Sequence, residues 1–287
     1  MMTRPAQLLS GTRYKTVDGL SIRFAESEPR GVQALLLCPW PESLYAFEPI
    51  WSRLAEHARL VAIDLPGFGH SEGRTELFGP RAMGEFLVRV ADAFGLELPH
   101  VVGPDVGTPA ALFAAARHPG RFRSLVVGSA GAVFPLQLGS PLREWVETPD
   151  RTQFVGAGRT VVTIALGKLV GFVPSESARE DYLASYVGDR FAESVRYVQA
   201  YPQELPSLQD LLPRITAPVQ IINGRRDQVV PLANAENLHL RLPRSRLDVL
   251  DAGHFVWEEA SEAYAELVVS WWRGGHAALG TALEGGG

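Results

Sequence analysis

Residues 103–107 read GPDVG and follow the apolar pair Val101-Val102. The pattern Gly-x-Asp-x-Gly, placed before a run of small residues, predicts a sharp strand-to-helix turn, because bulkier side chains would collide where the glycines stand. Such a turn holds its central side chain, here Asp105, at the carboxyl edge of a sheet. A carboxylate with a reference pKa of ~3.9 is already anionic at neutral pH. The stretch therefore predicts an α/β fold that presents an anionic nucleophile.

Short apolar runs alternate with helical patterns on both sides of this turn. Asp18-Gly19 predicts a two-residue hairpin between strands at residues 12–17 and 20–25. Further strands are predicted at residues 33–38, 60–63, 101–102, 124–127, 219–222 and 247–250. Helices are predicted at residues 44–57, 81–94, 109–118, 232–242 and 258–272. This alternation predicts a mostly parallel, doubly wound sheet with helices on both faces.

The alternation stops between residues 132 and 214. This stretch has no convincing buried strand, and its helical patterns lie at residues 159–170, 180–186 and 190–201, with prolines between them. A helical insertion in an α/β sheet is most simply a lid over the carboxyl edge. We therefore expect a core domain of residues 1–131 and 215–287, and a helical lid of residues 132–214 inserted after the sixth strand.

Composition restricts the partners and the compartment. The chain has 287 residues, of which 46% are apolar and 21% charged, and its net charge is −5, which argues against a nucleic-acid partner. The single cysteine, Cys38, excludes an intrachain disulfide and fits a reducing compartment. Residues 1–10 lack a secretory pattern, and no apolar run reaches ~18 residues. We expect a cytoplasmic protein with no membrane partner, and a homodimer is compatible with this sequence.

Two more segments bring polar residues to the same edge of the sheet. Asp227 follows the strand predicted at 219–222, and His254 follows the last strand, at 247–250. Loops after parallel strands open on one side, where ligands bind. Asp227 suits two roles, as the partner of His254 or as the cap of the turn at residues 229–231. The order nucleophile, acid, histidine favours a catalytic triad of Asp105, Asp227 and His254.

Cofactor sites are not predicted. The seven histidines are scattered, without paired spacing or a Cys–His cluster, so no metal site is expected. The stretch Gly67-Phe68-Gly69 lacks the third glycine of a dinucleotide fingerprint. We therefore expect a cofactor-free protein.

The whole chain resembles the α/β-hydrolase fold family, and the run DLPGFGHS at residues 64–71 is similar to one that the family carries after its fourth strand. With aspartate at the turn, the chain looks most like the epoxide hydrolase and haloalkane dehalogenase branch. The stretch CPWPES at 38–43 is similar to the His-Gly-x-Pro-Glu-Ser segment of epoxide hydrolases, with Cys38-Pro39 in place of His-Gly. The resemblance implies that the N–H groups of Trp40 and Val106 form an oxyanion hole.

A carboxylate nucleophile indicates the type of reaction. Attack on an ester would give a reactive anhydride, whereas attack at an sp3 carbon gives an ordinary alkyl ester. We expect Asp105 to displace a leaving group on a small apolar electrophile, after which His254, oriented by Asp227, activates water to hydrolyse the ester.

The leaving group separates the candidate activities. Epoxide hydrolases use lid tyrosines to protonate the alkoxide, and Tyr186 and Tyr197 are the candidates here. A halide needs N–H donors, and the family usually has a tryptophan after the nucleophile, where this chain has Val106. Trp145 could supply one donor. An epoxide hydrolase is therefore favoured over a haloalkane dehalogenase.

A non-hydrolytic protein on the same fold, such as a small-molecule receptor or a cyclising catalyst, stays a third alternative. Pro39 bears on this alternative because proline fixes φ and removes a donor. A Trp40 N–H that pointed away from Asp105 would favour it.

Overall fold

The computed structural model describes residues 11–279, so the prediction about a leader at residues 1–10 lies outside the described residues. Within this range eight strands form one sheet in the order β1-β2-β4-β3-β5-β6-β7-β8. The strands are β1 (Arg13–Val17), β2 (Leu20–Glu26), β3 (Gln33–Leu37), β4 (Arg59–Ile63), β5 (His100–Pro104), β6 (Ser124–Gly128), β7 (Val219–Gly224) and β8 (Ser245–Leu250). β1 pairs antiparallel with β2 and β2 with β4, whereas the other pairs are parallel.

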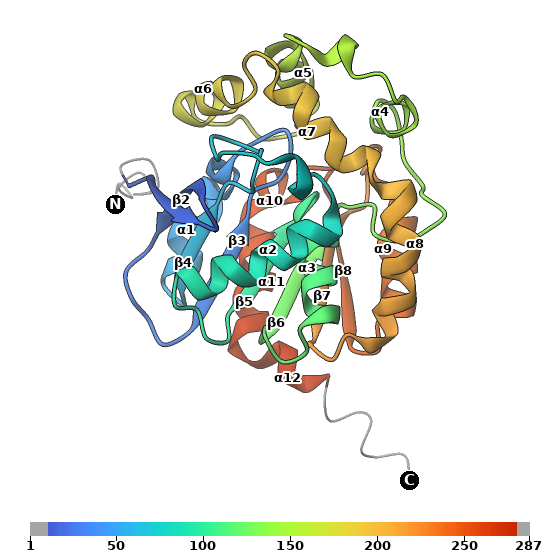
Figure 1. The fold of residues 1–287 in the computed structure, drawn as a ribbon. Coiled ribbons are helices and arrows are strands. Elements are labelled where there is room, and N and C mark those ends of the chain that lie inside the picture. Colours follow the sequence, from blue (N-terminus) through green and yellow to red (C-terminus); the bar gives the residue numbers. More distant parts are fainter. Residues whose placement is uncertain (1–10, 280–287) are drawn as a thin grey trace.

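Helices cover both faces of this sheet (Figure 1). α2 and α3 pack against each other on one face, and α1 packs against α11 on the opposite one. The α-helices are α1 (Glu48–Ala55), α2 (Pro80–Ala93), α3 (Gly107–Arg117), α4 (Leu142–Glu147), α5 (Gly158–Leu166), α6 (Glu176–Ser185), α7 (Arg190–Gln199), α8 (Tyr201–Leu211), α9 (Ala233–Arg241), α10 (Val256–Glu259), α11 (Ser261–Ser270) and α12 (His276–Ala278). Single turns add η1 (Leu44–Phe47), η2 (Thr75–Leu77), η3 (Thr152–Phe154), η4 (Leu212–Arg214) and the π turn η5 (Trp271–Gly275).

The burial of the central strands explains why their apolar runs could be recognised as strands in the sequence. Every residue of β5, β6 and β7 is buried, because helices cover the sheet on both sides. By contrast, β1 lies at the sheet edge and exposes four of its five residues. The predicted α/β-hydrolase fold, mostly parallel with an antiparallel edge, is confirmed.

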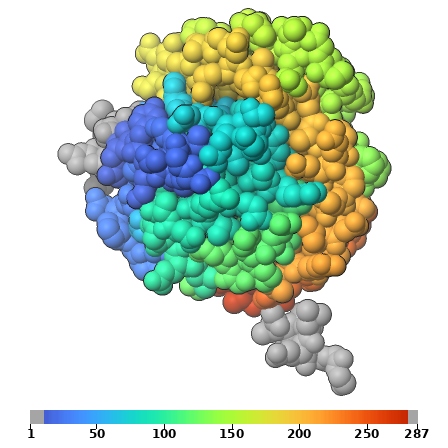
Figure 2. All heavy atoms as spheres, in the orientation of Figure 1, coloured from blue at the N-terminus to red at the C-terminus, as the bar shows by residue number. Residues whose placement is uncertain are grey.

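The chain between β6 and β7 forms α4 to α8. Figure 1 shows α4, α5, α6 and α7 above the carboxyl ends of the strands, and in the space-filling view the helices at the top rest directly on the core (Figure 2). α8 instead packs against α3, beside the sheet. The sequence did not predict α8, because Pro202 reads as a break; it stands in the first helical turn, where proline needs no intrahelical partner.

The described part of the chain contains no helix that could span a membrane. None of the helices within residues 11–279 combines the length and the apolar composition needed to cross a bilayer.

Candidate active site

Asp105 stands on a strained turn between β5 and α3. Its φ is +50°, in the left-handed region that non-glycine residues seldom occupy. A Cβ on Gly103 would lie 3.0 Å from the carbonyl oxygen of Gly107, and a Cβ on Gly107 would lie 3.1 Å from the Leu37 side chain. The Asp105 N–H donates to the carbonyl of Gly128 at 2.9 Å. Both glycines of the stretch 103–107 are therefore needed for close packing, as the sequence predicts.

The structure brings Asp105, Asp227 and His254 together. Nδ1 of His254 lies 2.8 Å from Oδ2 of Asp227, and Nε2 lies 3.7 Å from Oδ1 of Asp105. All three side chains are buried. The other oxygen of Asp227 accepts the N–H groups of Val229 and Val230 at 2.9 and 2.8 Å. Asp227 therefore fills both roles considered from the sequence, one with each oxygen.

The charges in this site depend on one another. Burial raises the pKa of Asp105, while His254 and the N–H groups of Trp40 and Val106 lower it. Burial opposes the positive charge of His254, but the charge and hydrogen bond of Asp227 and the charge of Asp105 raise the pKa of His254 to about 9. Both carboxylates therefore favour the protonated imidazole at neutral pH, which would face Asp105 as an ion pair.

Trp40 supplies the backbone donor expected from the sequence. Its N–H donates to Oδ2 of Asp105 at 2.7 Å, and the Val106 N–H also hydrogen-bonds to this carboxylate. Pro39 therefore does not turn the Trp40 N–H away. Cys38 is buried, and its sulfur accepts the N–H of Leu65 at 3.2 Å. The Cys38-Pro39 departure leaves the donor geometry of the fold intact.

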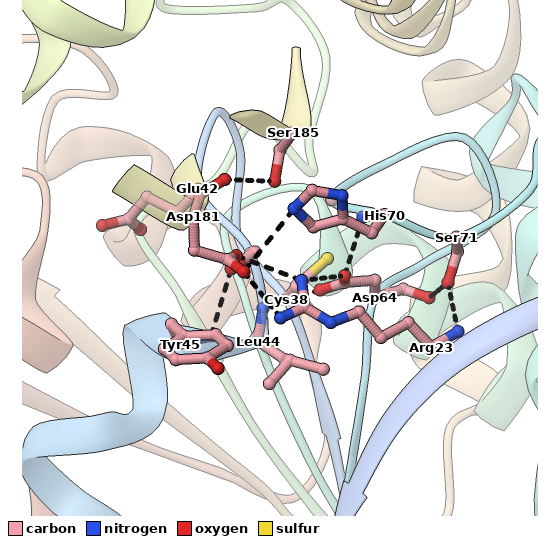
Figure 3. A network of polar contacts seen from close by, with 12 residues as sticks. Arg23, Cys38, Glu42, Leu44, Tyr45, Asp64, His70, Ser71, Asp181 and Ser185 are labelled. Atoms are coloured by element: carbon pink, nitrogen blue, oxygen red, sulfur yellow. Dashed lines mark hydrogen bonds and ion pairs between the residues drawn. The ribbon is translucent and has the colours of Figure 1, made fainter. Parts of the chain in front are cut away.

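A buried polar network supports the loop that carries Trp40 (Figure 3). The Asp64 carboxylate accepts the N–H groups of Leu44 at 2.7 Å and His70 at 2.8 Å. Arg23 faces Asp64 at 3.4 Å and binds Asp181 of α6 through two hydrogen bonds of 3.1 and 2.6 Å. One arginine thus ties the run at residues 64–71 to a helix above the sheet.

A cavity of about 200 Å³ opens above Asp105. Its walls are mostly apolar, and Trp145 packs edge-on against Trp40 with ring centroids 5.5 Å apart. The lining residues are Trp40, Pro41, Asp105, Pro141, Leu142, Trp145, Val161, Ile164, Ala165, Lys168, Val229, His254 and Phe255. The cavity therefore fits a small apolar molecule held against Asp105.

Tyr186 and Tyr197 occupy other positions than expected. In the described structure neither lines the cavity, and both are fully buried. The Tyr186 hydroxyl donates to the carbonyl of Glu42 at 3.0 Å, and the Tyr197 hydroxyl donates to the carbonyl of Val106 at 2.8 Å. The expectation that they face the leaving group is corrected: their hydroxyls hold backbone of the core, whereas Trp145 does line the cavity.

The sequence reasoning missed the contribution of α5 and the loop after it. Val161, Ile164, Ala165 and Lys168 line the cavity at a spacing that places them on one helical face. Lys168 is one of only two lysines in the chain, the other being Lys15. Both the spacing and the lysine are visible in the sequence, but only the fold shows that this face lies toward Asp105.

Metal binding finds no support in side-chain clustering. Within residues 11–279 no group of three or more His, Cys, Asp or Glu side chains is arranged to hold an ion.

Comparison with known proteins identifies the family. A family model described as the alpha/beta hydrolase fold matches residues 33–261, most of the chain. The protein therefore belongs to the alpha/beta hydrolase fold family and is a hydrolase.

Individual relatives have several activities. The chain is 30% identical over 224 residues to the 2-hydroxymuconate semialdehyde hydrolase of Pseudomonas putida. The matched region covers 75% of this chain and 77% of that protein. The chain is 27% identical over 251 residues to a pimeloyl-[acyl-carrier protein] methyl ester esterase of Neisseria meningitidis, covering 84% and 77%. A solved bacterial membrane phospholipase A superposes with a TM-score of 0.79 at 24% identity, over 96% of this chain and 88% of that one, which supports the fold alone. These relatives do not confirm the aspartate-nucleophile branch.

Proposed function

We propose that this hydrolase opens small apolar epoxides through an alkyl ester formed on Asp105. The observation that carries the proposal is a buried carboxylate at the nucleophile turn, with the Trp40 N–H 2.7 Å from one oxygen and His254 3.7 Å from the other. The relatives named above are hydrolases and an esterase, but a carboxylate that attacked an ester would form an anhydride. An sp3 carbon is the better electrophile for Asp105.

The reaction has two steps. Oδ1 of Asp105 attacks an epoxide carbon, the carbon–oxygen bond breaks, and the alkoxide takes a proton. His254 then loses its proton to solvent, accepts one from a water molecule, and the resulting hydroxide attacks the Asp105 carbonyl. The N–H groups of Trp40 and Val106 stabilise the oxyanion, each such donor contributing about 2.7–4 kcal/mol in comparable sites. The tetrahedral intermediate collapses, the proton of its hydroxyl group passes to the departing alcohol oxygen, the diol leaves, and Asp105 returns as a carboxylate.

Lys168 is the candidate donor to the alkoxide. The tyrosines expected in this role bond to backbone carbonyls instead. Lys168 lines the cavity, and its ammonium forms no ion pair with any described carboxylate. Because its side chain is exposed, solvent can return the proton after each turnover.

Displacement of a halide is the second candidate, and Trp145 favours it. Trp145 lines the cavity, and its indole N–H has no hydrogen-bond acceptor among residues 11–279, whereas the indole N–H of Trp40 donates to Ser194 at 2.9 Å. A free N–H can stabilise a leaving halide without transferring a proton. Val106 adds no side-chain donor, and on the described cavity wall Trp145 carries the one indole N–H without an acceptor.

Trapping the ester tests the mechanism. We expect His254→Gln to accumulate a covalent adduct on Asp105, because the ester forms but no base activates water, and Asp105→Asn to form none. Intact mass distinguishes the substrates: an epoxide adds its whole mass, whereas a haloalkane adds its alkyl group without the halogen. Asp92→Asn, which removes an exposed carboxylate, is the control and should behave as wild type. Full turnover by Asp105→Asn would refute the mechanism.

A further inference from the structure

Two buried glutamates meet beside the catalytic loops. Glu42 and Glu258 are 1% and 2% exposed, and their carboxyl groups lie within hydrogen-bonding reach of each other. Glu42 stands two residues after Trp40, and Glu258 stands four residues after His254 in α10. Their contact therefore joins the loop that carries the oxyanion donor to the helix that follows the catalytic histidine.

Each carboxyl group has one oxygen with a donor and one without. The Trp257 indole N–H donates to Oε2 of Glu42 at 3.1 Å, and the Tyr182 hydroxyl of α6 donates to Oε1 of Glu258 at 3.0 Å. Oε1 of Glu42 and Oε2 of Glu258 are buried and find no donor among residues 11–279. A buried acceptor without a donor costs free energy, and so do two adjacent buried anions. One proton between the two carboxyl groups removes both costs.

We propose that Glu42 and Glu258 share a proton, and that this hydrogen bond positions the Trp40 loop against α10. Through Trp257 the pair also supports the His254 ring, whose centroid lies 6.1 Å from the Trp257 ring at an interplanar angle of 71°. Through Tyr182 it reaches α6 above the sheet. Glu42 and Glu258 are positioning residues, since neither lines the cavity in the described structure.

The surroundings favour the protonated pair. Burial, followed by the charge of Glu258, raises the pKa of Glu42 well above its usual range, and burial raises the pKa of Glu258 to about 7. The neighbouring charges are acidic as well: Asp105 faces Glu42, while Glu259 and Glu48 face Glu258. The hydrogen bond from Trp257 lowers the pKa of Glu42, and the one from Tyr182 lowers the pKa of Glu258. Asp181 is a further acidic group near Tyr182.

The sign of the pH dependence follows from these directions. The folded protein holds a proton that the unfolded chain releases above the ordinary pKa of a glutamate, ~4.3. The pair's contribution to stability is therefore complete below that pH and is lost as the pH rises through 7 and beyond. His254, whose pKa is raised to about 9, also loses stabilisation as the pH rises, from ~6.5 upward, so the pair must be isolated by comparing variants.

Glu42→Gln and Glu258→Gln test the shared proton, because each amide N–H replaces it with a donor that does not titrate. Glu262→Gln, an exposed carboxylate on α11, is the matched control. We expect the Tm of wild type and control to fall by about 5 °C more between pH 7 and 9 than that of either glutamine variant. We also expect an infrared band of a protonated carboxyl group at neutral pH that both glutamine variants lack.

The proposal would be overturned if Tm fell equally between pH 7 and 9 in wild type, the control and both glutamine variants of the pair. It would also be overturned if the protonated-carboxyl band persisted in both of those glutamine variants. If one variant fails to fold, the other tests the same proton. Only the effect on turnover rests on the proposed function: above pH 7 the kcat of wild type with an epoxide should fall relative to that of the glutamine variants, with KM unchanged. Because the thermal and infrared measurements need no substrate, failure of the proposed function does not affect them.

Discussion

His254 carries a charge that two carboxylates maintain, and the proposed reaction removes one of them. In the resting protein the charges of Asp227 and Asp105 raise the pKa of His254 to about 9, so the imidazole is protonated at neutral pH. Esterification makes Asp105 neutral, which takes away part of this stabilisation while Asp227 keeps its hydrogen bond at 2.8 Å. In the proposed reaction, Asp105 therefore controls when His254 becomes available as a base.

A pH dependence of the second step follows from this coupling. We expect hydrolysis of the alkyl-enzyme to accelerate from pH 6 upward and to level off with an apparent pKa below about 9, because only neutral His254 can accept a proton from water. Rapid-quench mass measurement of the adduct after a single turnover would give this rate. A hydrolysis rate that falls between pH 6 and 9 would contradict the role of His254.

Lys168 separates the two candidate substrates. We expect Lys168→Met to slow ester formation from an epoxide by about 100-fold, since a general acid contributes 10²–10⁴-fold. Displacement of a halide by Asp105 should change little, because a halide leaves without a proton. Lys15→Met is the matched control, since Lys15 lies over the Phe94 ring away from the cavity. Equal losses with both substrates would show that Lys168 shapes the cavity rather than donating a proton.

Among the secondary-structure elements, α6 is attached to the core through buried charge. Asp181 on this helix receives two hydrogen bonds from Arg23 of β2 and one of 2.6 Å from the Ser43 hydroxyl (Figure 3). The Arg23 and Asp181 side chains are only 6% and 13% exposed, so water screens this pair weakly. The same helix carries Tyr182, which bonds to Glu258. α6 is therefore fixed at two points on the core.

Removing Asp181 should destabilise the fold. We expect Asp181→Ala to lower the free energy of unfolding by about 3 kcal/mol, the lower end for breaking a buried pair, because Asp64 still faces Arg23 at 3.4 Å. Urea unfolding with fluorescence detection would measure the change. Glu180→Ala, on the exposed face of the same helix, should have little effect. Equal effects of the two substitutions would mean that helix propensity, rather than the tether, decides the loss.

Within residues 11–279, one hydrophobic core includes the helices above the sheet. Buried residues of α6 and α7, among them Tyr182, Tyr186 and Tyr197, belong to the same cluster as the strands of the sheet. We therefore propose that the lid of residues 132–214 is an insertion packed on the core rather than an independently folding unit. We propose α4 to α7 as its extent above the sheet, because α8 packs beside α3.

A single unfolding transition follows from this shared core. We expect Trp145 in the insertion and Trp257 in the core, each followed as the difference in fluorescence between wild type and a variant that lacks it, to report the same urea midpoint. Trp257 belongs to the hydrophobic cluster and Trp145 packs against it, so burial of shared apolar surface couples the unfolding of the two regions. Trp51 on α1 serves as a second reporter for the core. Separate midpoints for Trp145 and the two core tryptophans would show that the insertion unfolds by itself.

Features that depend on contacts between residues close in the chain could be predicted from the sequence, whereas features that depend on packing between distant segments could not. The turn at residues 103–107 was predictable because its glycines are required by contacts within a few residues and with the adjoining strand. Asp227 and His254 were predictable because each follows a strand of the parallel part of the sheet, β7 and β8. The positions of the Tyr186 and Tyr197 hydroxyls could not be predicted, because a helical pattern gives the spacing of side chains but not which part of the protein each helix face packs against. Lys168 was missed for the same reason.

By itself, the sequence determined the α/β-hydrolase fold and the carboxylate at the turn after β5, because strand periodicity, glycine spacing and the charge of a carboxylate are properties of short segments. Only the tertiary structure decided which side chains surround that nucleophile. It directed the tyrosine hydroxyls to backbone carbonyls, brought Trp145 and Lys168 to the cavity, and placed Glu42 against Glu258. These contacts join segments far apart in the chain, so they depend on how the helices pack over the sheet and are not encoded in any one stretch of residues.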